Sequence, residues 1–106
     1  MHTISVQIVR FIDSSQPGWV ECLLRDASGR EWIFADKVPI FTEALLDASS
    51  TYPQPGVVVC EIMRDWTDGH GRRRCIISTE RPWGVEAIGG ETRFEVFKDQ
   101  IITPAA

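Results

Sequence analysis

Residues 18–41, GWVECLLRDASGREWIFADKVPIF, show the clearest pattern in the chain. In their first part apolar side chains alternate with bulky or charged ones, which is the period of a strand with one buried face. The inward-facing set is Val20, Cys22 and Leu24. Residues 26–29, Asp-Ala-Ser-Gly, then predict a tight turn, because Gly29 can adopt a positive φ. Residues 31–35 are rich in aromatic and β-branched side chains and predict a second, antiparallel strand.

A strand is also predicted before this hairpin, over residues 3–12. Its inward-facing side chains are Ile4, Val6 and Ile8. Val9 and Phe11 depart from this alternation, which predicts a bulge near Arg10. Residues 13–18 are rich in turn formers, so the first three strands should form an antiparallel meander.

A short helix is predicted after the third strand. Pro39 lacks the N–H group that a strand needs and therefore interrupts it. Residues 43–48, EALLDA, are good helix formers, and Thr42 is suited to cap their first turn. Leu45 and Leu46 would then pack against one end of the sheet.

Two further hairpins are predicted, with arms at residues 57–66 and 72–79 and at residues 85–88 and 91–97. The first hairpin surrounds TDGHG at residues 67–71, which should be an exposed tip. The second surrounds Gly89-Gly90, a pair suited to a type I′ turn, with Phe94 and Val96 facing inward. Residues 103–106 are expected to be frayed.

This element order favours a mainly β fold: a small antiparallel β-barrel, OB-like or SH3-like, with one short helix between the third and fourth strands. The OB-like order leads, and a two-layer roll with the helix on one face fits almost as well. Closure into a barrel would cover strand edges that otherwise invite pairing with other chains. Residues 1–106 are expected to form a single domain, since no repeat or linker divides them.

Composition limits the setting of the protein. The chain is 43% hydrophobic and 25% charged, as expected for a folded globular domain. It has no apolar run long enough for a membrane span and no signal-peptide pattern at its start, so we expect no membrane partner and a cytoplasmic location. The net charge of −4 argues against a general polyanion binder, although a local basic patch remains compatible with it.

The three cysteines do not form a recognisable framework. Cys22, Cys60 and Cys75 are odd in number and widely spaced, unlike disulfide scaffolds or zinc modules. Each shares the apolar phase of a predicted strand. We therefore expect all three to be buried, reduced core residues.

The main candidate binding surface surrounds the only basic run, Arg-Arg-Arg at residues 72–74. Strand alternation places two of these arginines on one face, and Trp66 beside them could stack on bases or on a partner's aromatic rings. A second candidate is the connector around Trp83. The candidate binding residues are Arg64, Trp66, His70, Arg72, Arg74, Arg81 and Trp83.

Each candidate also has a purely structural interpretation. The arginines could pair with nearby carboxylates, namely Glu61, Asp65 or Glu80. Trp83, held between proline and glycine, could plug one end of the barrel. Trp19 and Trp32 could lie next to each other across the first hairpin, where cross-strand pairing accounts for them.

No stretch carries a catalytic or cofactor motif, and neither a cofactor nor a metal is predicted. His70 has only Asp68 near it, too few ligands for a metal and no neighbour that would fix a catalytic base. The leading hypothesis is a non-enzymatic module that binds a protein partner or a second copy of itself. The alternative is a single-stranded nucleic-acid-binding OB-like domain with a stacking groove. An enzyme ranks last, because it would need Asp68, His70 or Glu80 to share a pocket with a cysteine.

Overall fold

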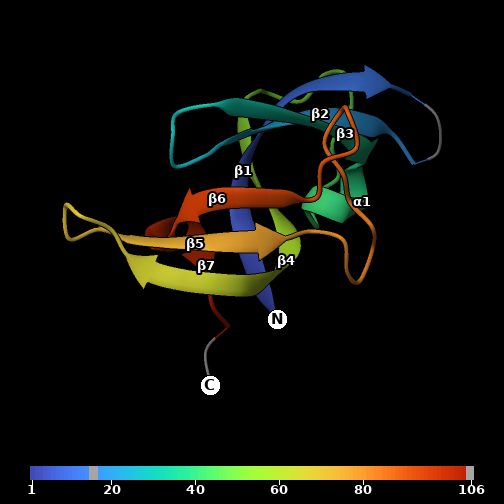
Figure 1. The fold of residues 1–106 in the computed structure, drawn as a ribbon. Helices are drawn as coiled ribbons and strands as arrows, with labels where there is room; N and C mark the ends of the chain where they lie inside the picture. Colours follow the sequence, from blue (N-terminus) through green and yellow to red (C-terminus); the bar gives the residue numbers. More distant parts are fainter. Residues whose placement is uncertain (15–16, 105–106) are drawn as a thin grey trace.

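The computed structural model describes residues 1–14 and 17–104. Its elements are β1 (His2–Asp13), β2 (Trp19–Arg25), β3 (Glu31–Lys37), α1 (Val38–Phe41), β4 (Gln54–Thr67), β5 (Arg73–Ser78), β6 (Arg93–Phe97), the short 3-10 helix η1 (Lys98–Gln100) and β7 (Ile101–Ile102). The fold is mainly β, with antiparallel strands in one curled, half-barrel sheet and a short helix between β3 and β4 (Figure 1). The predicted fold class is confirmed at this level, and the choice between OB-like and SH3-like stays a prediction.

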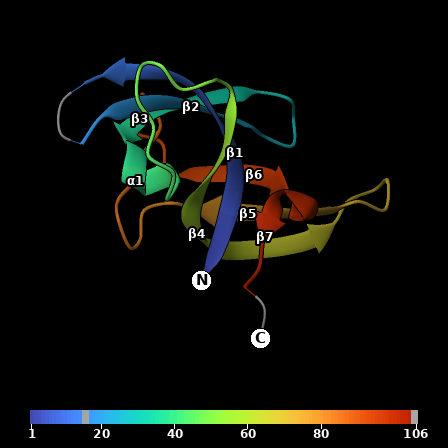
Figure 2. The ribbon, with the colours of Figure 1, turned by 180° about the vertical axis from the view of Figure 1, so that it is seen from behind.

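One long strand joins the two parts of the sheet. The strand order is β3-β2-β1-β4-β5-β6, with β7 beside β1. In β4, residues 54–60 pair with β1 and residues 61–67 pair with β5. The sheet therefore bends over at β4, so that β5 and β6 lie across from β2 and β3, as the view from behind also shows (Figure 2).

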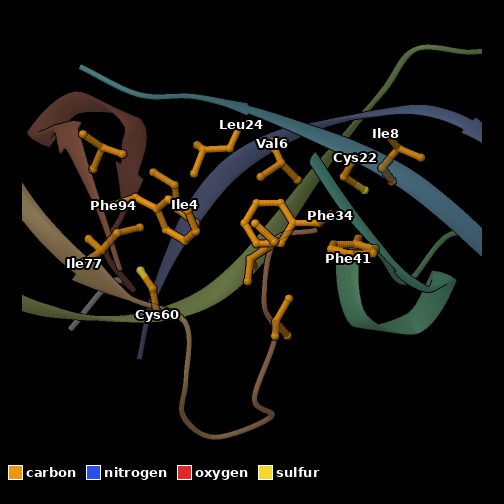
Figure 3. Close-up of a cluster of buried hydrophobic side chains, with 14 of the residues drawn as sticks. Ile4, Val6, Ile8, Cys22, Leu24, Phe34, Phe41, Cys60, Ile77 and Phe94 are labelled. Atoms are coloured by element: carbon orange, nitrogen blue, oxygen red, sulfur yellow. The ribbon is translucent and has the colours of Figure 1, made fainter. Parts of the chain in front are cut away.

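The core fills the inside of this curl. Ile4, Val6 and Ile8 from β1 are buried there, as predicted (Figure 3). The ring of Phe34 packs edge-on against Phe94, with 5.6 Å between the ring centroids. The remaining buried apolar residues of the strands are Val20, Cys22, Leu24, Val58, Cys60, Cys75, Ile77 and Val96.

All three cysteines are free and buried, which confirms the expectation that they are core residues. Burial raises the pKa of the Cys22 thiol to about 12 and that of Cys60 to about 11. Both therefore stay protonated at neutral pH, which suits a small apolar filler better than a nucleophile.

The seam between the two ends of the sheet is closed by a segment that is not a strand. Ala87 forms an isolated bridge with Phe34 of β3, and the Ile88 N–H donates to the Ile33 carbonyl at 2.8 Å. The predicted Gly89-Gly90 turn is present, with φ of 114° and 93°. The predicted pairing of residues 85–88 with β6 is wrong, because the bridge of Ala87 runs to β3 and β6 pairs with β5 instead.

The position of the helix differs from the prediction. Pro39 lies in the first turn of α1, where its missing N–H is not needed, so the helix begins at Val38 rather than after Thr42. Beyond it, the Thr42 hydroxyl oxygen accepts from the Ala44 N–H at 3.1 Å. Such side-chain hydrogen bonds compete with helix formation. Leu45 consequently points into solvent and is 99% exposed.

The two tryptophans of the first hairpin are not neighbours. Trp19 lies opposite Lys37 and Trp32 lies opposite Leu24, which places them at opposite ends of the hairpin. Trp32 instead packs edge-on against Phe94, at 5.2 Å between ring centroids. The predicted pair was wrong because the turn fixes the register and thereby separates the two positions.

The strand ends show smaller differences. The predicted bulge near Arg10 is confirmed by a register shift between Ile8 and Arg10. β7 was not predicted; it pairs Ile102 with Thr3 of β1. Residues 103–104 belong to no element, whereas 15–16 of the predicted turn and 105–106 of the predicted tail lie outside the described residues.

The relocated helix makes a testable prediction about stability. Phe41→Ala should lower the free energy of unfolding by about 3–5 kcal/mol, because the ring is buried. Leu45→Ala should change it by less than about 0.5 kcal/mol, because the side chain is 99% exposed. Chemical denaturation measures both. A loss above about 2 kcal/mol for Leu45→Ala would restore the packing role that the sequence predicted.

Candidate arginine–aromatic face

Four of the candidate residues gather on the outer face of the β4–β5 hairpin. Trp66 lies directly opposite Arg74, and Arg74 lies opposite Phe97 of β6. Arg64 and Arg72 flank this row. We call these five residues the arginine–aromatic face. Phe97 was missed by sequence analysis, although its alternation with the inward Val96 could have placed it on the outer side.

The arginines of this face lie over its rings. The Arg72 guanidinium carbon lies 3.4 Å from the centre of the Phe97 ring, and that of Arg74 lies 5.0 Å from it. Arg64 lies over Trp66 at 5.0 Å. Stacking of this kind holds a guanidinium close to the sheet and leaves its N–H groups free to bond carboxylates.

Most arginines of the hairpin are already matched by carboxylates. Arg74 bonds Asp68 at 2.7 Å and Glu95 at 3.1 Å, and Arg72 contacts Asp99 at 3.4 Å. Of the three arginines in the arginine–aromatic face, Arg64 is the one that has no ion pair with another described residue. The face therefore carries little net positive charge.

Some arginines outside the arginine–aromatic face are also paired with carboxylates. Arg73 pairs with Asp65 at 3.4 Å and Arg81 with Glu61 at 3.2 Å, which confirms two of the predicted partners. The third predicted partner, Glu80, forms no such pair within the described part of the chain.

Asp68 organises the tip of the hairpin. One of its oxygens accepts from the backbone N–H groups of His70 and Arg72, both at 2.9 Å. The other accepts from Nε of Arg74. The hydrogen bond from Arg74, followed by those from the backbone, lowers the pKa of Asp68 to about 2. His70 itself is exposed in the tip and does not join the face.

Arg81 and Trp83 lie at the other end of the hairpin. The Gly84 N–H donates to the Glu80 carbonyl at 2.7 Å and closes a tight turn that presents Trp83 outward. Trp83 is 55% exposed, so the prediction that it plugs the barrel is wrong. Val85 and Ala87 are buried after the turn and fill the interior in its place.

A feature that sequence analysis did not reveal is the outer edge of β4 over residues 61–67. Within the described ranges these residues pair only with β5, which leaves the opposite side of the strand unpaired. A register shift between Ile62 and Arg64 makes Met63 a bulge residue, and its side chain is 48% exposed. Figure 1 shows this part of β4 as the lowest strand of the sheet.

A hollow of about 330 Å³ lies between β1, β2 and Gln100, but its charged residues, Arg25 and Glu31, bond each other at 2.8 Å. No cluster of metal-binding side chains occurs among residues 1–14 and 17–104. None of the helices described has the length and hydrophobicity to cross a membrane.

Comparisons with family models, with curated proteins and with solved structures find no match to this chain.

The bonding of Asp68 predicts a specific titration. Its ordinary pKa is 3.8, so the folded state gains from the ionised form above about pH 4 and loses this gain as the pH falls through about 2. NMR of the carboxyl carbon should show a midpoint near 2. Arg74→Gln should raise that midpoint, whereas Arg73→Gln, which removes a partner of Asp65, should leave it in place. A wild-type midpoint near 3.8 would contradict the bonded geometry.

Proposed function

We propose that this chain is a non-enzymatic module that binds a protein partner by strand addition to the outer edge of β4. The single observation that carries the proposal is the unpaired side of residues 61–67 in the described structure. An exposed strand edge offers a row of N–H and C=O groups to an extended peptide. The partner's strand would continue the sheet beyond β4.

Each end strand of the sheet accepts a backbone hydrogen bond from another segment, whereas the backbone of residues 61–67 pairs with no segment besides β5 within the described structure. At β3, the Ile33 carbonyl is occupied by the Ile88 N–H at 2.8 Å. At β6, the Glu95 carbonyl accepts from the Ala27 N–H at 2.9 Å. The contrast supports residues 61–67 as the place where another chain would pair.

The side chains beside the edge support a protein partner. Trp66, Met63 and Arg64 are residue types that are enriched at protein interfaces, where tryptophan and arginine often dominate the binding energy. The carboxylates that match Arg72 and Arg74 reduce the attraction for a polyanion. The three unpaired cysteines suit a reducing compartment, and we propose a cytoplasmic location.

Peptide binding tests this function. Short peptides selected from a random displayed library on the immobilised protein should bind and shift the NMR signals of residues 61–67. Alternate backbone amides in this stretch should become protected from hydrogen exchange, because only every second N–H points to the outer side. Selected peptides that perturb other surfaces, or a selection that yields none, would overturn the proposal.

Light scattering tests whether the module instead binds a second copy of itself. If two copies pair through this edge, the mass should rise with concentration toward that of a dimer, and the same amides should become protected. A constant monomer mass at high concentration would remove this form and leave the heterologous partner.

The alternative, binding of single-stranded nucleic acid, is favoured by one observation: Trp66 and Phe97 lie in the same row as Arg74. Rings and guanidinium groups on one face could stack with bases. The β1–β2–β3 meander, the helix before β4 and the β4–β5 hairpin also support the OB-like interpretation on which this alternative rests.

A labelled oligonucleotide separates the two functions. The alternative expects binding that weakens as salt rises and that quenches tryptophan fluorescence, and Trp66→Ala should abolish most of the quenching. Trp19→Ala, at a distant tryptophan on β2, is the matched control. Absence of binding at low salt would eliminate this function.

A further inference from the structure

We infer that the partner strand is acidic: an extended peptide with a carboxylate opposite Arg64 and apolar side chains beside Met63 and Trp66. The inference rests on the proposed strand addition and specifies the chemistry of its partner. It follows from the charges that the described structure leaves uncompensated at the edge of β4.

Arg64 is the charge that an added strand would meet. Its guanidinium lies over Trp66 at 5.0 Å, while Arg72 and Arg74 are bound to carboxylates. Because residues 61–67 of β4 pair only with β5 in the described structure, a residue opposite Arg64 on an added strand would have its Cβ within about 5 Å of that of Arg64. A carboxylate there would complete the pairing that the other arginines of the arginine–aromatic face already have.

The acidic residues of the edge do not compete for this role. Glu61 is held by Arg81 at 3.2 Å. Asp65 lies opposite the buried Cys75, so its side chain belongs to the inner face of the sheet. The hydrogen bond from Lys98 at 3.0 Å lowers the pKa of Asp65. Arg64 therefore remains the unmatched charge on the outer side of the edge.

A second copy of this chain fits poorly in a pairing centred on Arg64. Two identical antiparallel strands related by a two-fold axis place one residue opposite itself. An axis at Arg64 would oppose two arginines, and an axis at Asp65 would oppose two aspartates. Like charges directly opposite each other destabilise a strand pair, so a pairing centred on Arg64 favours a different chain that supplies a carboxylate there.

Three short fluorescent peptides test this inference. They share an alternating threonine–valine sequence and differ only in the central residue, which is glutamate, glutamine or lysine. Anisotropy at low salt should show the glutamate peptide binding about threefold to fivefold tighter than the glutamine peptide, with the lysine peptide weakest. This preference should shrink at high salt.

Two charge reversals provide the matched variants. Arg64→Glu should invert the order, so that the lysine peptide binds best. Arg93→Glu makes the same charge change at an exposed position of β6, two strands away from the edge, and should leave the order unchanged. Circular dichroism checks that both variants are folded.

The outcomes separate the inference from the function on which it rests. Equal affinities for the three peptides, with shifts still confined to residues 61–67, would overturn the acidic preference and leave strand addition in place. The same would follow if Arg64→Glu kept the wild-type order. Binding of the peptides elsewhere, or of none of them, would overturn both.

Discussion

The structure depends on the change of hydrogen-bonding partner within β4. Up to Cys60 the strand pairs with β1, and from Glu61 it pairs with β5 on its other side. A single strand that serves both halves in this way makes the sheet bend over itself, so that one apolar face can enclose a core without a second layer of helices. The isolated bridge between Phe34 and Ala87 then joins β3 to the segment that precedes β6.

Within residues 1–14 and 17–104, the same change leaves each half of β4 with one side unpaired, and the two sides meet different surroundings. The first half lies against α1, where a Cβ added to Gly56 would approach the Phe41 carbonyl to 3.3 Å. The second half has no such cover among the described residues. Backbone groups at an uncovered edge must bond water or another chain. The edge is thus a consequence of how the half-barrel is built, and the bulge at Met63 and the charge of Arg64 restrict what can pair with it.

Local charge matching explains how an acidic chain carries a run of three arginines without a strongly basic surface. Asp68 accepts hydrogen bonds from the turn backbone and from Arg74. One carboxylate therefore both fixes the shape of the hairpin tip and neutralises the charge of Arg74. Arg73 faces the other side of the strand and meets Asp65. Within the arginine–aromatic face, Arg64 is therefore distinguished by its lack of a described carboxylate partner, rather than by its charge alone.

The sequence by itself determined the strands β1 to β6, their inward residues and the cysteines as core residues, because a two-residue period and turn chemistry are local properties. It also placed Arg72 and Arg74 on one face, and the strand register then showed that Trp66 shares it. Only the tertiary structure decided that the helix lies at α1, that residues 85–88 cross to β3, and that Trp83 is exposed. Only it showed which arginines find carboxylates and which strand edge stays open. These features depend on segments that are distant in the chain and meet only after the sheet has curled, so no local pattern encodes them.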